Sequence, residues 1–188
     1  QSHTSDSGHT WVRHPSSSAN AEIVSGYAKD QYGNAPLYYL DVIPASAEYE
    51  VSLNVTGSSY VMGPAGRIDT ALNSGYYIYR VGTQWRLYQR VSGTSTIIGT
   101  YGGDAPSATT PRVLKLEIKD ATKKLFIDGV ERITSTDNAV TATGRPGIFF
   151  SGTTSDHGDN FIVTAAGSSV STPDTTAPSV PTGITTGV

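Results

Sequence analysis

Glu48 and Glu50 are two carboxylates on one face of a stretch, residues 48 to 56, that alternates strictly between polar and apolar residues. Two carboxylates about 5 Å apart can serve as acid and nucleophile in glycoside cleavage. The alternation places this pair on the polar face of a half-buried strand. We therefore interpret the two side chains as a solvated strand face rather than a catalytic pair.

The four histidines, His3, His9, His14 and His157, are the residues that a metal site or a Ser-His-Asp triad would need. They lack the spacing of zinc ligands, and no Gly-x-Ser-x-Gly elbow accompanies them. We expect all four to be surface residues.

Tyrosine is abundant, with eleven residues against four phenylalanines. Lectin-like sites stack the apolar faces of sugars on Tyr or Trp, and a few polar groups orient the hydroxyls. Alternation puts Tyr77 and Tyr79 on one strand face; Arg86 and Tyr88 share a face of the next strand, opposite Trp85, which we expect in the core. With Arg67, these residues are the candidates for a sugar site on an exposed sheet face: Arg67, Tyr77, Tyr79, Arg86 and Tyr88. The alternative is that amphipathic side chains merely cover the sheet.

The elements that position these residues are short strands. Tyr49, Val51, Leu53 and Val55 form the apolar face of the clearest one, and Asp128-Gly129 between two apolar runs predicts a hairpin with a type I′ turn. We count about twelve short strands and no convincing helix, which predicts an all-β, antiparallel sandwich or barrel.

Composition excludes several classes of function. The net charge of -3 argues against nucleic acid as a partner. There is no cysteine for a disulfide or a thiolate-bound metal, and no apolar run approaches the roughly 20 residues needed for membrane insertion. Residues 1–166 are expected to form the domain, and residues 167–188, rich in Ser, Thr, Gly and Pro, a linker.

The motifs also occur in a familiar order along about residues 8 to 165: Gly66-Arg67, Tyr76-Tyr77, Trp85 to Tyr88, Leu114 to Leu116, Phe126 to Val130, Gly147-Ile148 and Asp159 to Val163. In this order the chain resembles bacterial modules of the laminin-G-like or concanavalin-A-like lectin and glucanase superfamily. The resemblance implies a jelly-roll β-sandwich, although the aromatic and acidic first strand usual in members is absent. Asp174 to Gly183 is similar to the entry into a fibronectin type III domain.

The resemblance also bears on catalysis and metal binding. Glycanases of this superfamily carry a Glu-x-Asp-x-(x)-Glu motif, of which only Glu48 and Glu50 find a counterpart here. In many such jelly rolls an Asp opening the last strand helps to hold a structural calcium ion, which makes Asp159, with Asp156 nearby, the candidate ligands. The alternative is that Asp159 and Asn160 hydrogen-bond their own turn.

These inferences predict a non-catalytic, extracellular carbohydrate-binding or adhesive module of a larger secreted or surface protein, with a polysaccharide or glycan as partner and a fibronectin type III-like domain as neighbour. A structural spacer or protein-interaction module, as in a surface filament or tail fibre, is the alternative. An enzyme of the keto-glycoside hydrolase type is a third hypothesis.

The calcium hypothesis makes a prediction that thermal unfolding tests. A ligand that binds only the native state raises the midpoint, so added calcium is expected to raise it relative to chelator-treated protein. Substitution of Asp159 by Asn should abolish the difference. Equal midpoints in calcium and in chelator would contradict a structural ion.

Overall fold

A computed structural model describes residues 3–4, 8–18, 20–24, 27–30, 35–57, 60–107, 109–150 and 156–166. These residues form sixteen strands, all paired antiparallel, and no helix, so that within them no helix crosses a membrane. The all-β prediction is confirmed, and the strands beyond the expected twelve are mostly pieces of two to four residues. The predicted linker and its fibronectin-like segment, Asp174 to Gly183, lie outside the described residues.

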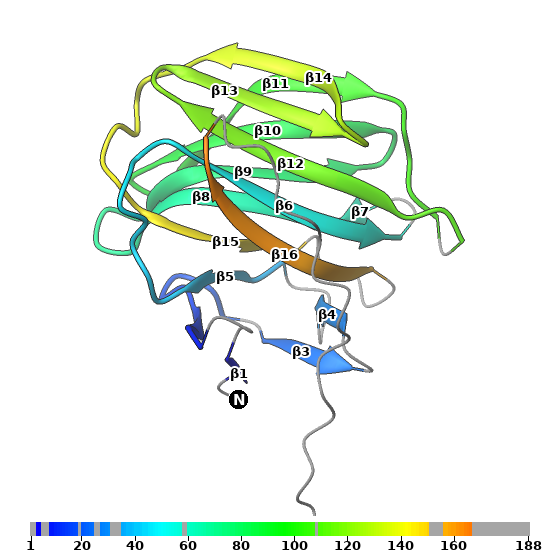
Figure 1. The fold of residues 1–188 in the computed structure, drawn as a ribbon, viewed down its shortest axis with the longest axis horizontal. Helices are drawn as coiled ribbons and strands as arrows, with labels where there is room; N and C mark the ends of the chain where they lie inside the picture. The colour runs from blue at the N-terminus through cyan, green and yellow to red at the C-terminus, as the bar shows by residue number, and fades with distance from the viewer. Residues whose placement is uncertain are drawn as a thin grey trace, which may run out of the picture.

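Two sheets face each other as a sandwich (Figure 1). Sheet A contains, in spatial order, β1 (His3–Thr4), β2 (Thr10–Arg13), β5 (Leu37–Leu40), β15 (Arg145–Phe149), β8 (Gly63–Asp69), β9 (Ser74–Val81), β10 (Gln84–Val91) and β11 (Thr94–Gly102), with β7 (Tyr60–Val61) paired to β9. Sheet B contains β14 (Val130–Thr136), β13 (Thr122–Ile127), β12 (Arg112–Lys119), β6 (Tyr49–Thr56), β16 (His157–Ala165), β4 (Tyr27–Asp30) and β3 (Ala21–Val24). In Figure 1, β6, β12 and β16 cross in front of β8, β9 and β10.

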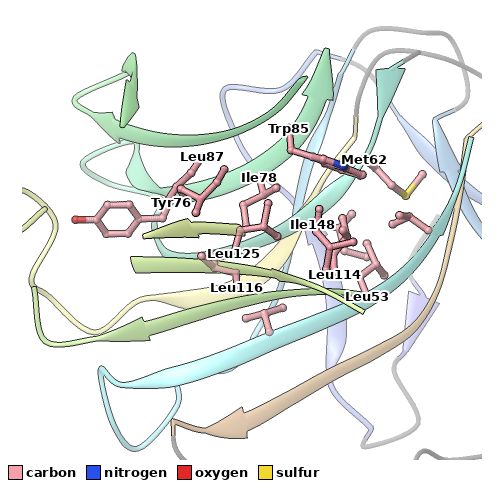
Figure 2. Close-up of a cluster of buried hydrophobic side chains, with 14 of the residues drawn as sticks. Leu53, Met62, Tyr76, Ile78, Trp85, Leu87, Leu114, Leu116, Leu125 and Ile148 are labelled. Carbon is pink, nitrogen blue, oxygen red and sulfur yellow. The ribbon is translucent and has the colours of Figure 1, made fainter. Parts of the chain in front are cut away.

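The core between the sheets follows from alternation along the strands. Every second residue of β6 is buried, and those of β12, Leu114, Leu116 and Ile118, pack in the same cluster. Tyr76 and Ile78 of β9 face them from sheet A, together with Trp85, which is fully buried as predicted. Figure 2 shows the Trp85 indole beside Met62, and the Tyr76 ring at the other end of the cluster. Burial of this apolar area is the main stabilising contribution.

Tight turns join neighbouring strands where the sequence predicts them. Asp128 and Gly129 both have positive φ, 51° and 80°, as a type I′ turn requires. Ser92 and Gly93 repeat this pattern between β10 and β11. The Asp128 turn is fixed further by its carboxylate, which accepts hydrogen bonds from Arg112 (2.7 Å) and from the Val113 amide (2.9 Å).

Arg67 lies in the core, not on the exposed sheet face, so its predicted placement is wrong. The register of β8 shifts at a bulge between Gly66 and Asp69, and Arg67 has a φ of 49°, in the left-handed region. This bulge turns the side chain inward, where it is 3% exposed. Its guanidinium donates to the carbonyl oxygens of Ala47 (3.0 Å) and Val140 (2.7 Å).

A buried polar network surrounds Arg67 at one end of the core. The Tyr49 hydroxyl donates to the Gly144 carbonyl at 3.0 Å and accepts the Arg67 amide. The Tyr76 hydroxyl donates to the Asp137 carboxylate at 2.5 Å and accepts the Val140 amide at 3.2 Å. The network therefore holds the connection between β14 and β15, which passes from sheet B to sheet A, against the core.

Lys123 completes this network from β13. Its ammonium donates to the carbonyl oxygens of Asp120 and Asp137, each at 2.8 Å, and lies 4.9 Å from the centre of the Tyr76 ring. Burial, reinforced by the charge of Arg67, lowers the pKa of Lys123 from 10.5 to about 8.

The Arg67 network predicts a large effect for an apolar replacement. Arg67→Met leaves the buried carbonyl of Val140 and the part-buried carbonyl of Ala47 without this donor, and each such loss costs about 1–3 kcal/mol. We expect the free energy of unfolding, measured by urea denaturation, to fall by about 3 kcal/mol. Arg112→Met, which removes only the surface ion pair with Asp128, is the matched control and should cost less than about 1 kcal/mol. Equal losses would show that the network contributes no more than a surface pair.

The lowered pKa of Lys123 predicts that stability rises with pH between about 8 and 10. In this window the folded state holds Lys123 neutral while the unfolded chain keeps it protonated, so the unfolded state binds more protons. The rise attributable to Lys123 is at most about 1.4 kcal/mol per pH unit. Lys123→Met should flatten it in urea denaturation series, whereas Lys119→Met, at an exposed position of β12, should not.

Candidate functional site

The three tyrosines predicted to bind sugar lie together on the outer face of sheet A, away from the core. Tyr77 and Tyr79 alternate along β9 with the core residues Tyr76 and Ile78. Tyr77 pairs with Tyr88 of β10. The alternation along both strands therefore predicted the shared face correctly, but the expected exposure is wrong for Tyr77 and Tyr88, which are buried.

Phe149 of β15 joins these tyrosines, and the four rings stack on one another. Ring centres are 5.1 Å apart between Tyr77 and Tyr88, and 5.0 Å between Tyr79 and Tyr88, with interplanar angles of 9° and 12°. Phe149 lies 4.4 Å from Tyr77 and 4.9 Å from Tyr79. We call these four residues, Tyr77, Tyr79, Tyr88 and Phe149, the aromatic cluster.

The aromatic cluster is closed at one side and accessible at the other. Tyr77 and Tyr88 are 5% and 7% exposed, because they pack on Leu37, Tyr39, Ala65 and Ile68 of the same face. Tyr79 and Phe149 are only partly buried. These two rings offer the surface on which an apolar ligand face can stack.

One polar group of the cluster gathers around Arg86. This residue pairs with Tyr79 across the strands, and its guanidinium donates to the Tyr88 hydroxyl at 3.4 Å. Burial, together with the neighbouring Tyr88 hydroxyl, raises the pKa of Tyr79, which keeps its phenol protonated at neutral pH. Two hydroxyls and a guanidinium thus border the accessible rings.

A second polar group lies at the other end of the cluster. The Tyr77 hydroxyl donates to Ser95 Oγ at 2.6 Å, and Ser95 pairs with Arg90. His14 is buried nearby at 1% exposure, with its ring edge-on to Tyr39 at 6.4 Å. Burial and the charge of Arg90 lower the pKa of His14, so the ring is neutral at neutral pH. The prediction that His14 is a surface residue is wrong.

Phe149 and His14 were not expected on this face, and Arg90, which alternation places on it, was not among the candidate site residues. Phe149 belongs to the apolar run 148 to 150, which on its own does not tell which residues face outward. The signal for Arg90 was present, because it alternates with Arg86 and Tyr88 on β10. His14 follows β2 directly, in a region without a readable pattern.

The predicted calcium ligands, Asp156 and Asp159, do not assemble a metal site with other described residues. Asp159 accepts a hydrogen bond from the Asn160 amide at 2.7 Å, at a bulge in β16. Asp156 is buried at 1% exposure, with one carboxylate oxygen against Gly57. Among the described residues no group of three or more His, Cys, Asp or Glu side chains gathers as metal ligands. Calcium also takes backbone and amide carbonyl oxygens as ligands, so calcium binding stays a prediction.

The carboxylates of Glu48 and Glu50 lie in different environments. Glu50 is 3% exposed and pairs with Lys115 at 3.2 Å, so the expectation of a solvated side chain is wrong there. Across the strands it faces Glu117, whose pKa is raised by burial and by Glu50. Glu48 borders a pocket of about 240 Å³ whose lining contains no second carboxylate.

Solved structures of similar fold include carbohydrate-binding and galectin-like domains, and also a glycosidic hydrolase and a sialidase. The carbohydrate-binding module CBM66 from Bacillus subtilis matches with a TM-score of 0.68 and 13% identity, over 82% of this chain and 95% of that chain. A Bacillus subtilis protein of unknown function with a galectin-like fold matches with a TM-score of 0.64 and 12% identity, over 82% of this chain and 89% of that chain. The carbohydrate recognition domain of Emp47p matches with a TM-score of 0.60 and 9% identity, over 83% of this chain and 88% of that chain.

At such low identities these similarities establish the fold alone, an antiparallel β-sandwich. No protein-family model and no curated protein sequence matches this chain.

Proposed function

We propose that this chain is a carbohydrate-binding module whose sugar site is the aromatic cluster with Arg86. The observation that carries the proposal is the stack of four rings on the outer face of sheet A, bordered by tyrosine hydroxyls and a guanidinium. Sugar rings have apolar faces that stack on aromatic side chains, while their hydroxyls need a few fixed polar groups. The similar folds of CBM66 and of the Emp47p carbohydrate recognition domain support this assignment.

The setting of the module is part of the same proposal. We propose that it belongs to a secreted or surface protein, as a non-catalytic unit followed by a fibronectin type III-like neighbour. The neutral composition rich in Ser, Thr and Gly and the segment Asp174 to Gly183 support this setting.

The proposal predicts that binding depends on the accessible ring and its polar neighbour. Tyr79→Ala should lower affinity for the bound polysaccharide by about tenfold, since it removes both a stacking surface and a hydroxyl. Tyr79→Phe keeps the ring and should lose less. Ligands are first found on a glycan array, and affinities are then measured by titration calorimetry.

Tyr27→Ala is the matched control, because Tyr27 is an exposed tyrosine (44%) on β4 of sheet B. Its affinity should equal that of the native protein, and thermal unfolding should confirm that each variant is folded. Absence of binding to every glycan on the array would exclude the proposal and favour a spacer or protein-interaction module.

A further inference from the structure

We propose that the ligand of the aromatic cluster is an acidic polysaccharide, held through its carboxylates by Arg86 and Arg90. This inference rests on the proposed carbohydrate-binding function and specifies the substrate class. Arg86 and Arg90 alternate with Tyr88 along β10, so both guanidinium groups rise from the sheet face that carries the stacked rings. Aromatic rings and cations therefore form one continuous surface.

Neither of these arginines has an acidic partner among the described residues. Arg86 contacts the Tyr88 hydroxyl, and Arg90 lies beside Tyr77, Ser95 and His14. Other arginines of the chain are neutralised: Arg112 pairs with Asp128 at 2.7 Å, Arg132 with Asp104 at 2.7 Å and Arg145 with Asp41 at 3.4 Å. Unlike these three, Arg86 and Arg90 form no ion pair with a described carboxylate, and unlike the buried Arg67 they lie on the outer face of sheet A.

The groups packed around Arg90 do not neutralise it. His14 is uncharged, because burial and Arg90 itself lower its pKa. Asp69 is the carboxylate that acts electrostatically on His14. Its Oδ1 atom accepts hydrogen bonds from the backbone amides of Ala71 and Leu72, at 2.9 Å each, and it forms no ion pair with Arg86 or Arg90. The positive charge on this face is therefore available to a ligand.

Guanidinium chemistry and spacing together specify that ligand. The planar fork of arginine matches a carboxylate with two parallel hydrogen bonds. Four residues along a strand separate the two arginines by roughly 13 Å, which is longer than one sugar ring. The pair is therefore suited to a polymer with repeated carboxylates, such as a polyuronate, lying across the stacked rings.

Matched acidic and neutral polymers test this inference. Polygalacturonate, alginate and hyaluronan are compared with their carboxyl-reduced forms and with a panel of neutral polysaccharides, using affinity electrophoresis and calorimetry. At least one acidic polymer should bind the full chain, and its carboxyl-reduced form should bind at least tenfold more weakly. Affinity for the acidic form should also fall with added salt, because exposed charges are screened.

Variants assign the effect to the two residues. Arg86→Gln and Arg90→Gln should each weaken binding of the acidic polymer about tenfold or more, while Arg86→Lys, which keeps a charge but not the fork, should fall between. Lys119→Gln removes one positive charge from an exposed site on sheet B and should leave affinity unchanged. Thermal unfolding verifies that all variants are folded.

The outcomes separate this inference from the function on which it rests. Binding to neutral polysaccharides with no preference for acidic ones, and no effect of Arg86→Gln or Arg90→Gln, would overturn the inference and leave the carbohydrate-binding function intact. Equal binding of dextran sulfate would also overturn it, by showing unspecific ion exchange. Absence of binding to every polymer would remove both.

Discussion

The buried guanidinium of Arg67 is the interaction on which the arrangement of the two sheets depends. No described carboxylate forms an ion pair with it. Instead the guanidinium donates hydrogen bonds to the carbonyl oxygens of Ala47 and Val140, and the backbone amide of Arg67 donates to the Tyr49 hydroxyl. A buried charge is tolerated only when hydrogen bonds replace its hydration. Gly144 packs closely against the same residue, because a Cβ atom at position 144 would lie only 2.4 Å from the Arg67 backbone. The crossing from β14 to β15 is thereby fixed.

That crossing determines the candidate site, because it delivers β15 to its place between β5 and β8. Phe149 then comes to rest beside Tyr77 on the outer face. The aromatic cluster remains without a covering strand among the described residues, and its rings shield one another by stacking. Tyrosine suits this position, because each ring is apolar while its hydroxyl stays hydrated or hydrogen-bonded. The four rings therefore cover one another in part, while Tyr79 and Phe149 remain accessible.

The sequence predicted those features that arise from strict alternation or from turn chemistry. Alternation along β6, β9 and β10 separated core from outer face correctly, including Trp85 and Tyr77. The expected exposure of Arg67 was wrong, because a bulge, which the sequence pattern does not show, turns this residue inward. Alternation could not find Phe149, since an apolar run has no period and the ring partners of Phe149, Tyr79 and Tyr77, are 70 and 72 residues away. Strand patterns carry no information on whether calcium or a glycan binds.

The strand order of sheet A has a consequence for the newly synthesised chain. β15 bonds to β5 on one side and to β8 on the other, so the sheet stays divided until the segment ending at Phe149 has been made. Pairings between such distant segments form slowly, and strand edges are exposed meanwhile. After Tyr88 has been made, about sixty further residues are synthesised before Phe149 can pack beside Tyr77 and Tyr79. The face that carries the aromatic cluster is completed late, so a truncated chain that ends before β15 would leave Tyr77, Tyr79 and Tyr88 without Phe149 beside them.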